Sequence, residues 1–373
     1  MIYLDYTANT PVDPEVLDVY THAAIHYPAN PNSSHALGQE AREELQRVTN
    51  HLAEMLDVLP EEIIYTSGAT EANNLAIKGL ARAARRRGKH MISTPLEHSS
   101  VSGALTALQE RGWEIDLLDI GRNGKVDPQQ IKELIRDDTV LVSVCGVDSE
   151  LGSVQPVYEI AEILQDYPNC VFHVDFTQVM GKIPAAFDGI DLASFTAHKF
   201  YGLNGTGVLY KRKGLVLEPQ MSGGTSTTLY RSGTPDLAGA AALDAALTKA
   251  LCKEAGRKQY IAGLNARLRD ALGQYEAVQI NSPGDAVPHI LNLSVKGVKG
   301  DVFQQALSDE GVCVSVKSAC SVKGTPSRPV FAVSRDRKRA MSSWRISLSH
   351  LTTEEELDEF LKIFDKVYHE LVK

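Results

Sequence analysis

Residues 195–207 read FTAHKFYGLNGTG, and the organisation of the whole chain can be worked out from this stretch. Thr196 stands two positions before the pair His198-Lys199, and a glycine-rich segment follows at once. An amine held at the end of a strand beside flexible backbone suits Schiff-base chemistry, in which a lysine is both nucleophile and proton carrier. The alternative is a surface lysine in a turn, which is what most lysines are.

Short apolar stretches alternate with helical patterns on the way to this pair. Such alternation predicts an α/β fold, with a mostly parallel sheet between helices. These sheets bind ligands at the carboxyl ends of their strands, where Thr70, His98, Asp175, His198 and Lys199 are expected. The expected strands are residues 63–66, 91–94, 114–118, 140–145, 170–174, 191–196 and 208–211.

The turn Ser67-Gly68-Ala69-Thr70 lies between an expected strand and an expected helix. Unpaired backbone N–H groups and the helix dipole point to the same spot there, so the turn is typical of an anion site. It lacks the GK[ST] ending of a phosphate-binding Walker loop and is not the dinucleotide fingerprint. A plain helix-capping turn is the alternative.

Composition excludes several other classes of protein. A chain of 373 residues predicts about two domains, and its 43% hydrophobic and 23% charged residues are ordinary for a globular protein. The net charge of -9 argues against a general nucleic-acid binder. No apolar run is long enough for a membrane helix, and the N-terminus does not read as a secretory signal.

The cysteines point to a reducing compartment. They are odd in number and have no CxxC spacing, which argues against a disulfide framework or a zinc site, and no metal is expected. They are Cys145, Cys170, Cys252, Cys313 and Cys320.

From residue 222 the pattern changes, and we expect a domain boundary near Ala255. A large domain is predicted over residues 13–255, and a smaller α+β domain combines residues 1–12 with 256–373. Residues 321–343 read as a long basic loop, and Cys320 stands at its start. Cys320 is either an ordinary small buried residue or an exposed nucleophile whose thiolate is favoured by the positive charge nearby. The expected strands of this domain are 278–281, 289–294, 312–316 and 344–348, and its helices are 302–310 and 353–372.

Many of these segments occur together, in the same order, in one known family. The chain resembles the cysteine desulfurases of the NifS/IscS type, within the class V aminotransferases that use pyridoxal 5'-phosphate. The resemblance implies fold type I, with a mostly parallel seven-stranded sheet between helices and a smaller α+β domain that carries a catalytic cysteine loop at about 320–343. The matching segments are YLDYTANTPVD, NPNSSHALGQEAR, YTSGATEANNLAIKG, EHSSV, ELGSVQP, FHVDFTQVMGKIP, TAHKFYGLNGTGVLY, RSGT, SVKSACS and WRISLSHLTTEEELDEF.

The resemblance assigns roles around the cofactor ring. Lys199 would hold the cofactor covalently and take the Cα proton of the substrate. Asp175 would keep the pyridine nitrogen protonated, so that the ring acts as an electron sink. Gln178 would bind the phenolic oxygen, and His98 would lie over the ring and help to move protons. Without the resemblance, Asp175 and His98 would be read as helix-capping residues.

Further roles concern the substrate, the phosphate and the second subunit. Arg345 would hold the substrate carboxylate by a two-pronged contact, unless it is a surface arginine at a strand edge, and Asn30 would also touch the substrate. Thr234 would reach the phosphate of the other subunit, which implies a homodimer. The donors to the phosphate would be Gly68, Ala69, Thr70, Thr196 and His198.

The implied reaction converts L-cysteine to L-alanine. The thiolate of Cys320 would attack the substrate sulfur and become a persulfide. An acceptor protein, either an iron–sulfur cluster scaffold or a tRNA-thiolation enzyme, would then receive the sulfur, unless the enzyme serves a specialised pathway. The resemblance implies a cytoplasmic enzyme with no direct contact to nucleic acid or membrane.

The chain departs from the family pattern near the expected site. The family's LDNAATTP reads LDYTANTP here, which introduces Tyr6, Thr7 and Asn9. The family's NNE(I/T)G begins here with Asp148-Ser149, so Ser149 replaces an asparagine expected near the phenolic oxygen. The family's GGGQERGLRSGT reads GGTSTTLYRSGT. These changes concern the identity of the substrate and the rate rather than the fold.

Two alternatives to a desulfurase follow from the sequence. One is another pyridoxal phosphate reaction on the same fold: a β-lyase, a selenocysteine lyase or a transaminase. Cys320 discriminates against a plain lyase or transaminase, which needs no thiol. The other is a non-catalytic member that acts as a binding protein. The joint presence of five residues argues against it: Lys199, Asp175, His98, Arg345 and Cys320.

Overall fold

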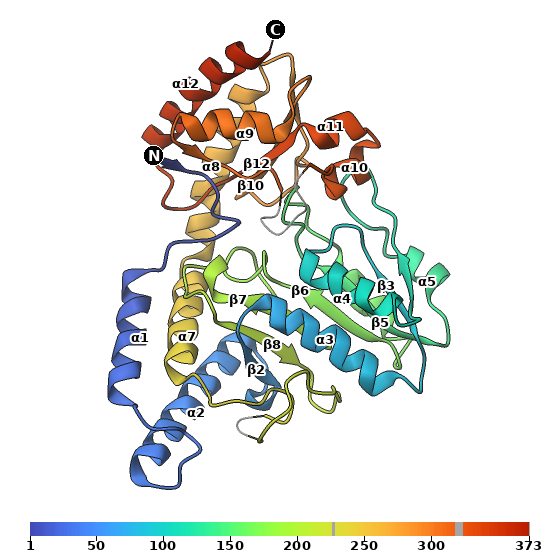
Figure 1. The fold of residues 1–373 in the computed structure, drawn as a ribbon, viewed down its shortest axis with the longest axis vertical. Helices are drawn as coiled ribbons and strands as arrows, with labels where there is room; N and C mark the ends of the chain where they lie inside the picture. Colours follow the sequence, from blue (N-terminus) through green and yellow to red (C-terminus); the bar gives the residue numbers. More distant parts are fainter. Residues whose placement is uncertain (226–227, 318–323, 373) are drawn as a thin grey trace.

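In the computed structural model, which describes residues 1–225, 228–317 and 324–372, two groups of elements are stacked along the long axis of the molecule (Figure 1). The larger group is built on a seven-stranded sheet with the strand order β2-β8-β7-β6-β5-β3-β4. These strands are β2 (Ile63–Thr66), β3 (His90–Ser93), β4 (Glu114–Leu117), β5 (Thr139–Cys145), β6 (Val171–Asp175), β7 (Leu192–Thr196) and β8 (Gly207–Lys211).

Helices cover both faces of this sheet. They are α1 (Pro14–His26), α2 (Ala36–Leu56), α3 (Ala69–Ala84), α4 (Ser99–Gln109), α5 (Gln130–Leu134), α6 (Val157–Leu164) and α7 (Leu237–Cys252), with the short 3₁₀ turns η1 (Pro60–Glu62) and η2 (Ala197–Lys199).

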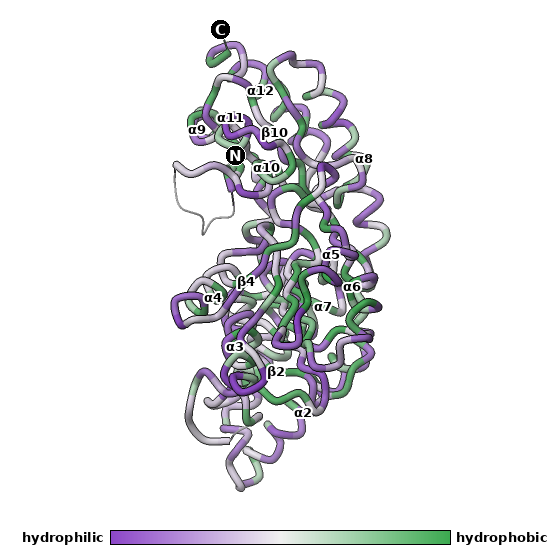
Figure 2. Tube along the Cα trace, turned by 90° about the vertical axis from the view of Figure 1, so that its right-hand side faces the viewer, coloured by the Kyte–Doolittle hydropathy of each residue, from purple (hydrophilic) through white to green (hydrophobic). Residues whose placement is uncertain are grey.

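Alternating side chains of the strands divide the core into two apolar layers. On β8, Val208 and Tyr210 belong to the cluster that also holds α6 and α7, whereas Leu209 belongs to the cluster that holds α3 and α4. Successive side chains of a strand point to opposite faces, so the sheet lies between the two layers. Figure 2 shows apolar, green stretches in the middle of this body and mixed colours along the outer helices.

The mostly parallel sheet that the sequence predicts is confirmed, with one strand of opposite direction. β8 pairs antiparallel with both β7 and β2, while the pairs among β7, β6, β5, β3 and β4 are parallel. The carboxyl ends of β2, β5, β6 and β7 therefore meet at one edge of the sheet. Thr66, Cys145, Asp175 and Thr196 are the residues at these ends.

The smaller group combines the first residues of the chain with the last third (Figure 1). β10 lies between antiparallel β12 and β9, and β1 pairs parallel with β11. Trp344 and Phe303 stack at 5.3 Å in its apolar core. The elements are β1 (Ile2–Tyr3), α8 (Glu254–Leu272), β9 (Val278–Ile280), β10 (Ile290–Val295), α9 (Gly300–Asp309), β11 (Val312–Cys313), α10 (Arg328–Ser334), α11 (Arg337–Met341), β12 (Ser343–Ser347) and α12 (Glu354–Leu371).

The prediction of an irregular loop over residues 321–343 is wrong for much of that stretch. Residues 328–341 form α10 and α11 instead. Ser327 caps α10 by accepting the N–H of Val330, and a proline stands in the first turn. Asp336 caps α11 by accepting the N–H groups of Lys338 and Arg339. Short capped helices leave little hydrophobic periodicity in the sequence, which explains the wrong expectation. Within the described part of the chain, no helix combines the length and apolarity that crossing a membrane requires.

Candidate active site

A cavity of about 320 Å³ opens at the sheet edge where the strand ends meet, a size within the usual range for small-molecule sites. Its wall includes most of the residues that the sequence singles out. They are Gly68, Ala69, Thr70, His98, Ser149, Asp175, Gln178, Thr196, His198, Lys199 and Arg345.

Two of the predicted residues that the structure describes do not line this cavity. Asn30 lies in the loop between α1 and α2, where its side chain accepts the N–H of Asn32. Thr234 is exposed and lies outside the cavity of its own chain. Cys320 falls outside the described residues.

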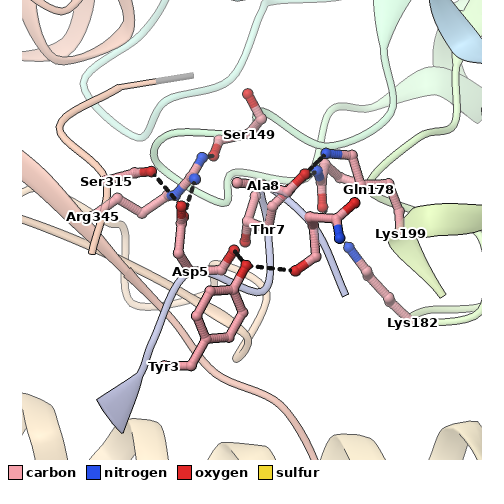
Figure 3. Close-up of polar contacts among 11 residues, drawn as sticks. Tyr3, Asp5, Thr7, Ala8, Ser149, Gln178, Lys182, Lys199, Ser315 and Arg345 are labelled. Carbon is pink, nitrogen blue, oxygen red and sulfur yellow. Dashed lines mark hydrogen bonds and ion pairs between the residues drawn. The ribbon is translucent and has the colours of Figure 1, made fainter. Parts of the chain in front are cut away.

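Lys199 ends η2, directly after β7, and its amine reaches into the cavity. The Nζ atom donates to the carbonyl of Thr7 at 2.9 Å and to that of Ala8 at 2.5 Å (Figure 3). The same N-terminal segment is fixed to this turn by Thr10, whose N–H and hydroxyl both donate to the carbonyl of His198. The segment therefore sets the position of the lysine amine.

Asp175 is the last residue of β6 and is only 5% exposed. Its Oδ1 accepts the N–H of Thr177 and its Oδ2 accepts the amide of Asn73, both at 2.9 Å. Hydrogen bonds to both oxygens favour the charged carboxylate. Asp175 thus places a fixed negative charge on the wall of the cavity.

A hydrogen-bonded chain runs from Asp175 to His98. The amide nitrogen of Asn73 donates both to Asp175 and to Ser100 Oγ at 2.9 Å, and Ser100 Oγ lies 2.8 Å from Nδ1 of His98. The backbone N–H of Ser100 also donates to that Nδ1, so the neutral ring carries its proton on Nε2. Burial, together with the positive charge of Lys199, lowers the pKa of His98 although Asp175 opposes the shift. His98 therefore offers a neutral N–H donor.

The N-terminus of α3 supplies an anion site on the cavity wall. Gly68 precedes the helix with φ 142°, in the region that favours glycine. A Cβ added to Gly207 would come within 2.6 Å of Gly68, so glycine lets the two backbones approach closely. The hydroxyl of Thr196 donates to the carbonyl of Thr206 and therefore accepts from Nδ1 of His198 at 3.0 Å.

Arg345 is buried in β12 and brings a positive charge to the opposite side of the cavity (Figure 3). Its Nη2 lies 2.9 Å from Asp5 Oδ1, and its Nη1 donates to the carbonyl of Ser149 at 2.7 Å. The second oxygen of Asp5 accepts the hydroxyl of Ser315 at 2.7 Å. Asp5 and Ser315 thereby fix the guanidinium, and Ser149 takes part through its backbone rather than its side chain.

Gln178 joins the cavity wall to a second lysine. Its Nε2 donates to the carbonyl of Thr7, and its Oε1 accepts Nζ of Lys182 at 2.5 Å (Figure 3). Burial and the charges of Lys199 and Arg345 hold the pKa of Lys182 well below its usual value. Burial, together with the positive charges of Lys199 and Lys182, lowers the pKa of His198 to about 4.

Glu97 and Cys145 form a buried titratable pair at the cavity wall, which Cys145 lines. Oε1 of Glu97 accepts the N–H of Cys145 at 2.8 Å and the hydroxyl of Thr94 at 2.9 Å. Burial raises the pKa of Glu97 to about 8, and burial with Glu97 as neighbour raises the pKa of the Cys145 thiol. Because Glu97 is therefore mostly neutral near pH 7, the negative charge on this part of the cavity wall belongs to the carboxylate of Asp175.

Sequence reasoning missed the residues that orient the site. Asn73, Ser100, Asp5, Ser315 and Lys182 act on functional side chains through hydrogen bonds or charge, although none was expected there. Asn73 and Asp5 belong to quoted motifs, SGATEANN and YLDYTANTP, which is a signal that could have suggested them. Their partners lie 102 and 340 positions away in the chain, so no local pattern reveals the contacts.

The donor set fits pyridoxal 5'-phosphate. A lysine amine, a buried carboxylate, a helix N-terminus with a glycine cradle and a histidine line one cavity. They match an aldehyde, a pyridine nitrogen and a phosphate in charge and hydrogen bonding. Among the described residues no cluster suitable for a metal ion is found.

Comparison with known proteins agrees with this assignment. The sequence model of the family "Aminotransferase class-V" matches residues 2–360. A "NifS/IcsS protein homolog" of Lactobacillus delbrueckii subsp. bulgaricus is 37% identical and covers 100% of this chain and 98% of its own. A "Cysteine desulfurase IscS" of Photorhabdus laumondii is 38% identical over 98% of this chain and 92% of its own. Among solved structures, a "NIFS-LIKE PROTEIN" superposes with a TM-score of 0.93 at 32% identity, over 99% of this chain and 100% of its own.

Proposed function

The chain belongs to the class-V aminotransferase family as a cysteine desulfurase of the NifS/IscS type, and we propose that it converts L-cysteine to L-alanine and passes the sulfur to Cys320. The observation that carries the proposal is the convergence of Lys199, Asp175, His98 and Arg345 on one cavity. These residues come from distant parts of the chain, and a protein that only binds a partner would not need all four of them in one cavity.

The residues around the cavity would each hold one part of the cofactor. Pyridoxal 5'-phosphate, when bound, supplies an electron sink for negative charge at the substrate Cα. Lys199 would bind its aldehyde carbon, and Asp175 would accept a hydrogen bond from its pyridine nitrogen. The first turn of α3 would hold the phosphate through its backbone N–H groups, and Thr196 and His198 would lie beside the phosphate.

Arg345 and Lys199 would orient and activate the substrate. Arg345 would bind the substrate carboxylate, because its buried guanidinium is already aimed at the cavity by Asp5 and Ser315. Nζ of Lys199 would take the proton from Cα. His98 would donate from Nε2 to a group that gains negative charge, since its Nδ1 is occupied as an acceptor.

The sulfur step conserves atoms and electrons. The Cys320 thiolate would attack the substrate sulfur, so that an S–S bond forms as the Cβ–S bond breaks. The electron pair from the broken bond remains with the substrate carbon, which gains protons and leaves as alanine. Cys320 keeps the sulfur as a persulfide and returns to the thiol when an acceptor protein takes that sulfur.

A single turnover of the cofactor-loaded enzyme with L-cysteine, without reductant, tests this function. We expect alanine together with one extra sulfur on Cys320 by mass spectrometry, and neither product from Cys320→Ser. Pyruvate as product, or alanine that does not depend on Cys320, would instead identify a lyase or another pyridoxal phosphate reaction.

The active unit would be a homodimer. Thr234 is exposed and lies outside the cavity of its own chain, as expected if it serves the phosphate of a second copy. A mixture of inactive Thr234→Ala and inactive Lys199→Ala chains tests this arrangement. Activity that returns on mixing supports a shared site, and a light-scattering mass of one chain contradicts it.

The last part of the proposal concerns the acceptor. The sulfur would pass to a protein, either an iron–sulfur scaffold or a tRNA-thiolation enzyme, in the cytoplasm. Relatives named IscS support a role in iron–sulfur assembly. Transfer of ³⁵S from labelled enzyme to purified candidate acceptors would discriminate between the two.

A further inference from the structure

A second, smaller cavity lies on the other side of Lys199. Its volume is about 40 Å³, and Lys199 lines both this cavity and the larger one. Six segments meet there. They are the N-terminal strap (residues 4–10), the turn after β6, the turn at η2, the first turns of α8, the residues before β10 and the residues after β12. We call it the rear cavity.

Three nitrogen atoms at the rear cavity have no hydrogen-bond partner within the described part of the chain. They are Nε2 of His289, Nδ1 of His350 and Nε of Arg257, and all three atoms are buried. His289 is only 6% exposed. Buried polar atoms are nearly always paired in native proteins, so three such atoms around one cavity indicate a missing partner.

The ionisable side chains that line the rear cavity are mostly basic. Lys182, Arg257, Lys258, His289 and His350 all line the rear cavity, and its one acidic side chain belongs to Glu254. Burial lowers the pKa of Lys182, His289 and His350, and neighbouring lysines and arginines lower each of them further. Burial also raises the pKa of Glu254, so burial disfavours the charged form of all these groups, and an anion beside them would favour positive charge on the bases.

Tyr201 holds the two outer donors in place. Its ring packs edge-on against His350 at 4.6 Å, and the Arg257 guanidinium lies over it at 5.2 Å. Its backbone has φ 69°, which is unusual for tyrosine. The hydroxyl of Tyr201 bonds to Ser349 at 2.6 Å, and its N–H donates to Thr10 at 2.8 Å. Tyr201 thus has a strained backbone, and hydrogen bonds hold both its N–H and its hydroxyl. This indicates that its side of the rear cavity is rigid before any ligand binds.

We propose that the rear cavity binds one small inorganic anion, of the class of chloride or sulfate. The donors are the nitrogen atoms of His289, His350 and Arg257, and the guanidinium of Arg257 supplies positive charge. The volume of 40 Å³ corresponds to about three water positions, which excludes an amino acid or a nucleotide. Binding at this place requires neither substrate nor cofactor, so it does not depend on the proposed desulfurase reaction.

The position gives the anion an effect on the active site. Lys182 and Lys199 repel one another across the wall, and this repulsion contributes to the lowered pKa of Lys182. An anion in the rear cavity would offset that repulsion and stabilise positive charge on the amines near it. Chloride or sulfate would therefore shift the pH at which the absorbance of the bound cofactor changes, towards higher pH.

Crystals of the holoenzyme soaked in bromide give a direct test, because bromide scatters anomalously. We expect an anomalous peak between His289 and Arg257 and, in sulfate-grown crystals, tetrahedral density at the same place. Arg257→Met should remove the peak, whereas Arg267→Met should keep it, since Arg267 is on the same helix but pairs with Asp358 at the surface. His350→Phe keeps the packing on Tyr201 and provides a second variant.

A solution measurement completes the test. Titration of chloride and of sulfate against thermal stability of the holoenzyme should show saturable stabilisation. Arg257→Met and His350→Phe should each weaken the affinity roughly tenfold, which is the usual effect of losing a hydrogen bond to a charged group. Absence of density in the rear cavity, or equal affinity in Arg257→Met and Arg267→Met, overturns the proposal.

Discussion

Replacing Arg345 with lysine tests how the substrate is held. Lysine keeps the positive charge beside Asp5 but cannot make a two-pronged contact with a carboxylate. The loss of one charge-assisted hydrogen bond costs about 1.5–3 kcal/mol, which corresponds to roughly a 10- to 150-fold decrease in kcat/KM for L-cysteine. Alanine formation under steady-state conditions measures it, and most of the decrease should appear in KM.

The matched control is Arg339→Lys. Arg339 is another partly buried arginine with two hydrogen bonds, to Asn281 Oδ1 at 2.6 Å and to the carbonyl of Ile280 at 3.0 Å, and it lies outside the cavity. Both variants should lose a similar free energy of unfolding, about 1 kcal/mol, in urea. A kcat/KM of Arg345→Lys within about twofold of Arg339→Lys would refute the role of Arg345, because the decrease in kcat/KM estimated above would be absent.

Three further predictions follow from the hydrogen-bond and pKa observations. Asn73→Ala removes the amide that donates to Oδ2 of Asp175 and to Oγ of Ser100. We therefore expect a loss of about 2 kcal/mol in urea unfolding and faster loss of the cofactor on dialysis; unchanged values would contradict the network. The pKa of Glu97 is about 8 in the folded protein and 4.5, its ordinary value, in the unfolded chain. Between these two pH values the folded state keeps a proton that the unfolded state has lost, so the free energy of unfolding should decrease as pH rises. The decrease should be at most about 1.4 kcal/mol per pH unit. Glu97→Gln should flatten this slope, and an unaltered slope would show that Glu97 does not cause it. Thr353→Ala removes the capping box of α12 and should cost about 1 kcal/mol by thermal or urea unfolding, and activity should stay unchanged.

Elements with local signals could be predicted from the sequence, whereas contacts between them could not. Asp13 caps α1 as its type and position suggest, and β6 ends at Asp175 within a residue of the expected place. The direction of β8 was missed because an apolar strand of five residues carries no sign of its orientation. The wall of the site could be predicted because strand ends in such sheets share an edge.

The hydrogen bonds that orient the site residues could not be predicted from the sequence, because they depend on tertiary packing. Lys182 follows a glycine in a turn, where a lysine is ordinarily exposed, and only tertiary packing brings it beside Gln178. His289, His350 and Arg257 are unremarkable at their positions in the sequence. Only in the folded chain does each have a buried nitrogen atom with no hydrogen-bond partner among the described residues. A cavity of this kind forms only when residues from distant parts of the chain pack together, so no local sequence pattern indicates it.

The N-terminal strap links the two halves of the site. Leu4 accepts the N–H of Ser347 and Asp5 fixes Arg345, so one end of the strap belongs to the smaller group of elements. The carbonyls of Thr7 and Ala8 accept from Lys199, so the other end belongs to the sheet. The distance between the lysine amine and the arginine thus depends on a short turn, in which the N–H of Ala8 donates to the carbonyl of Asp5. Tyr6, Thr7 and Asn9, where the chain departs from the family pattern, fall in this strap. We therefore expect them to act on the geometry between the amine of Lys199 and the guanidinium of Arg345 rather than on either group alone.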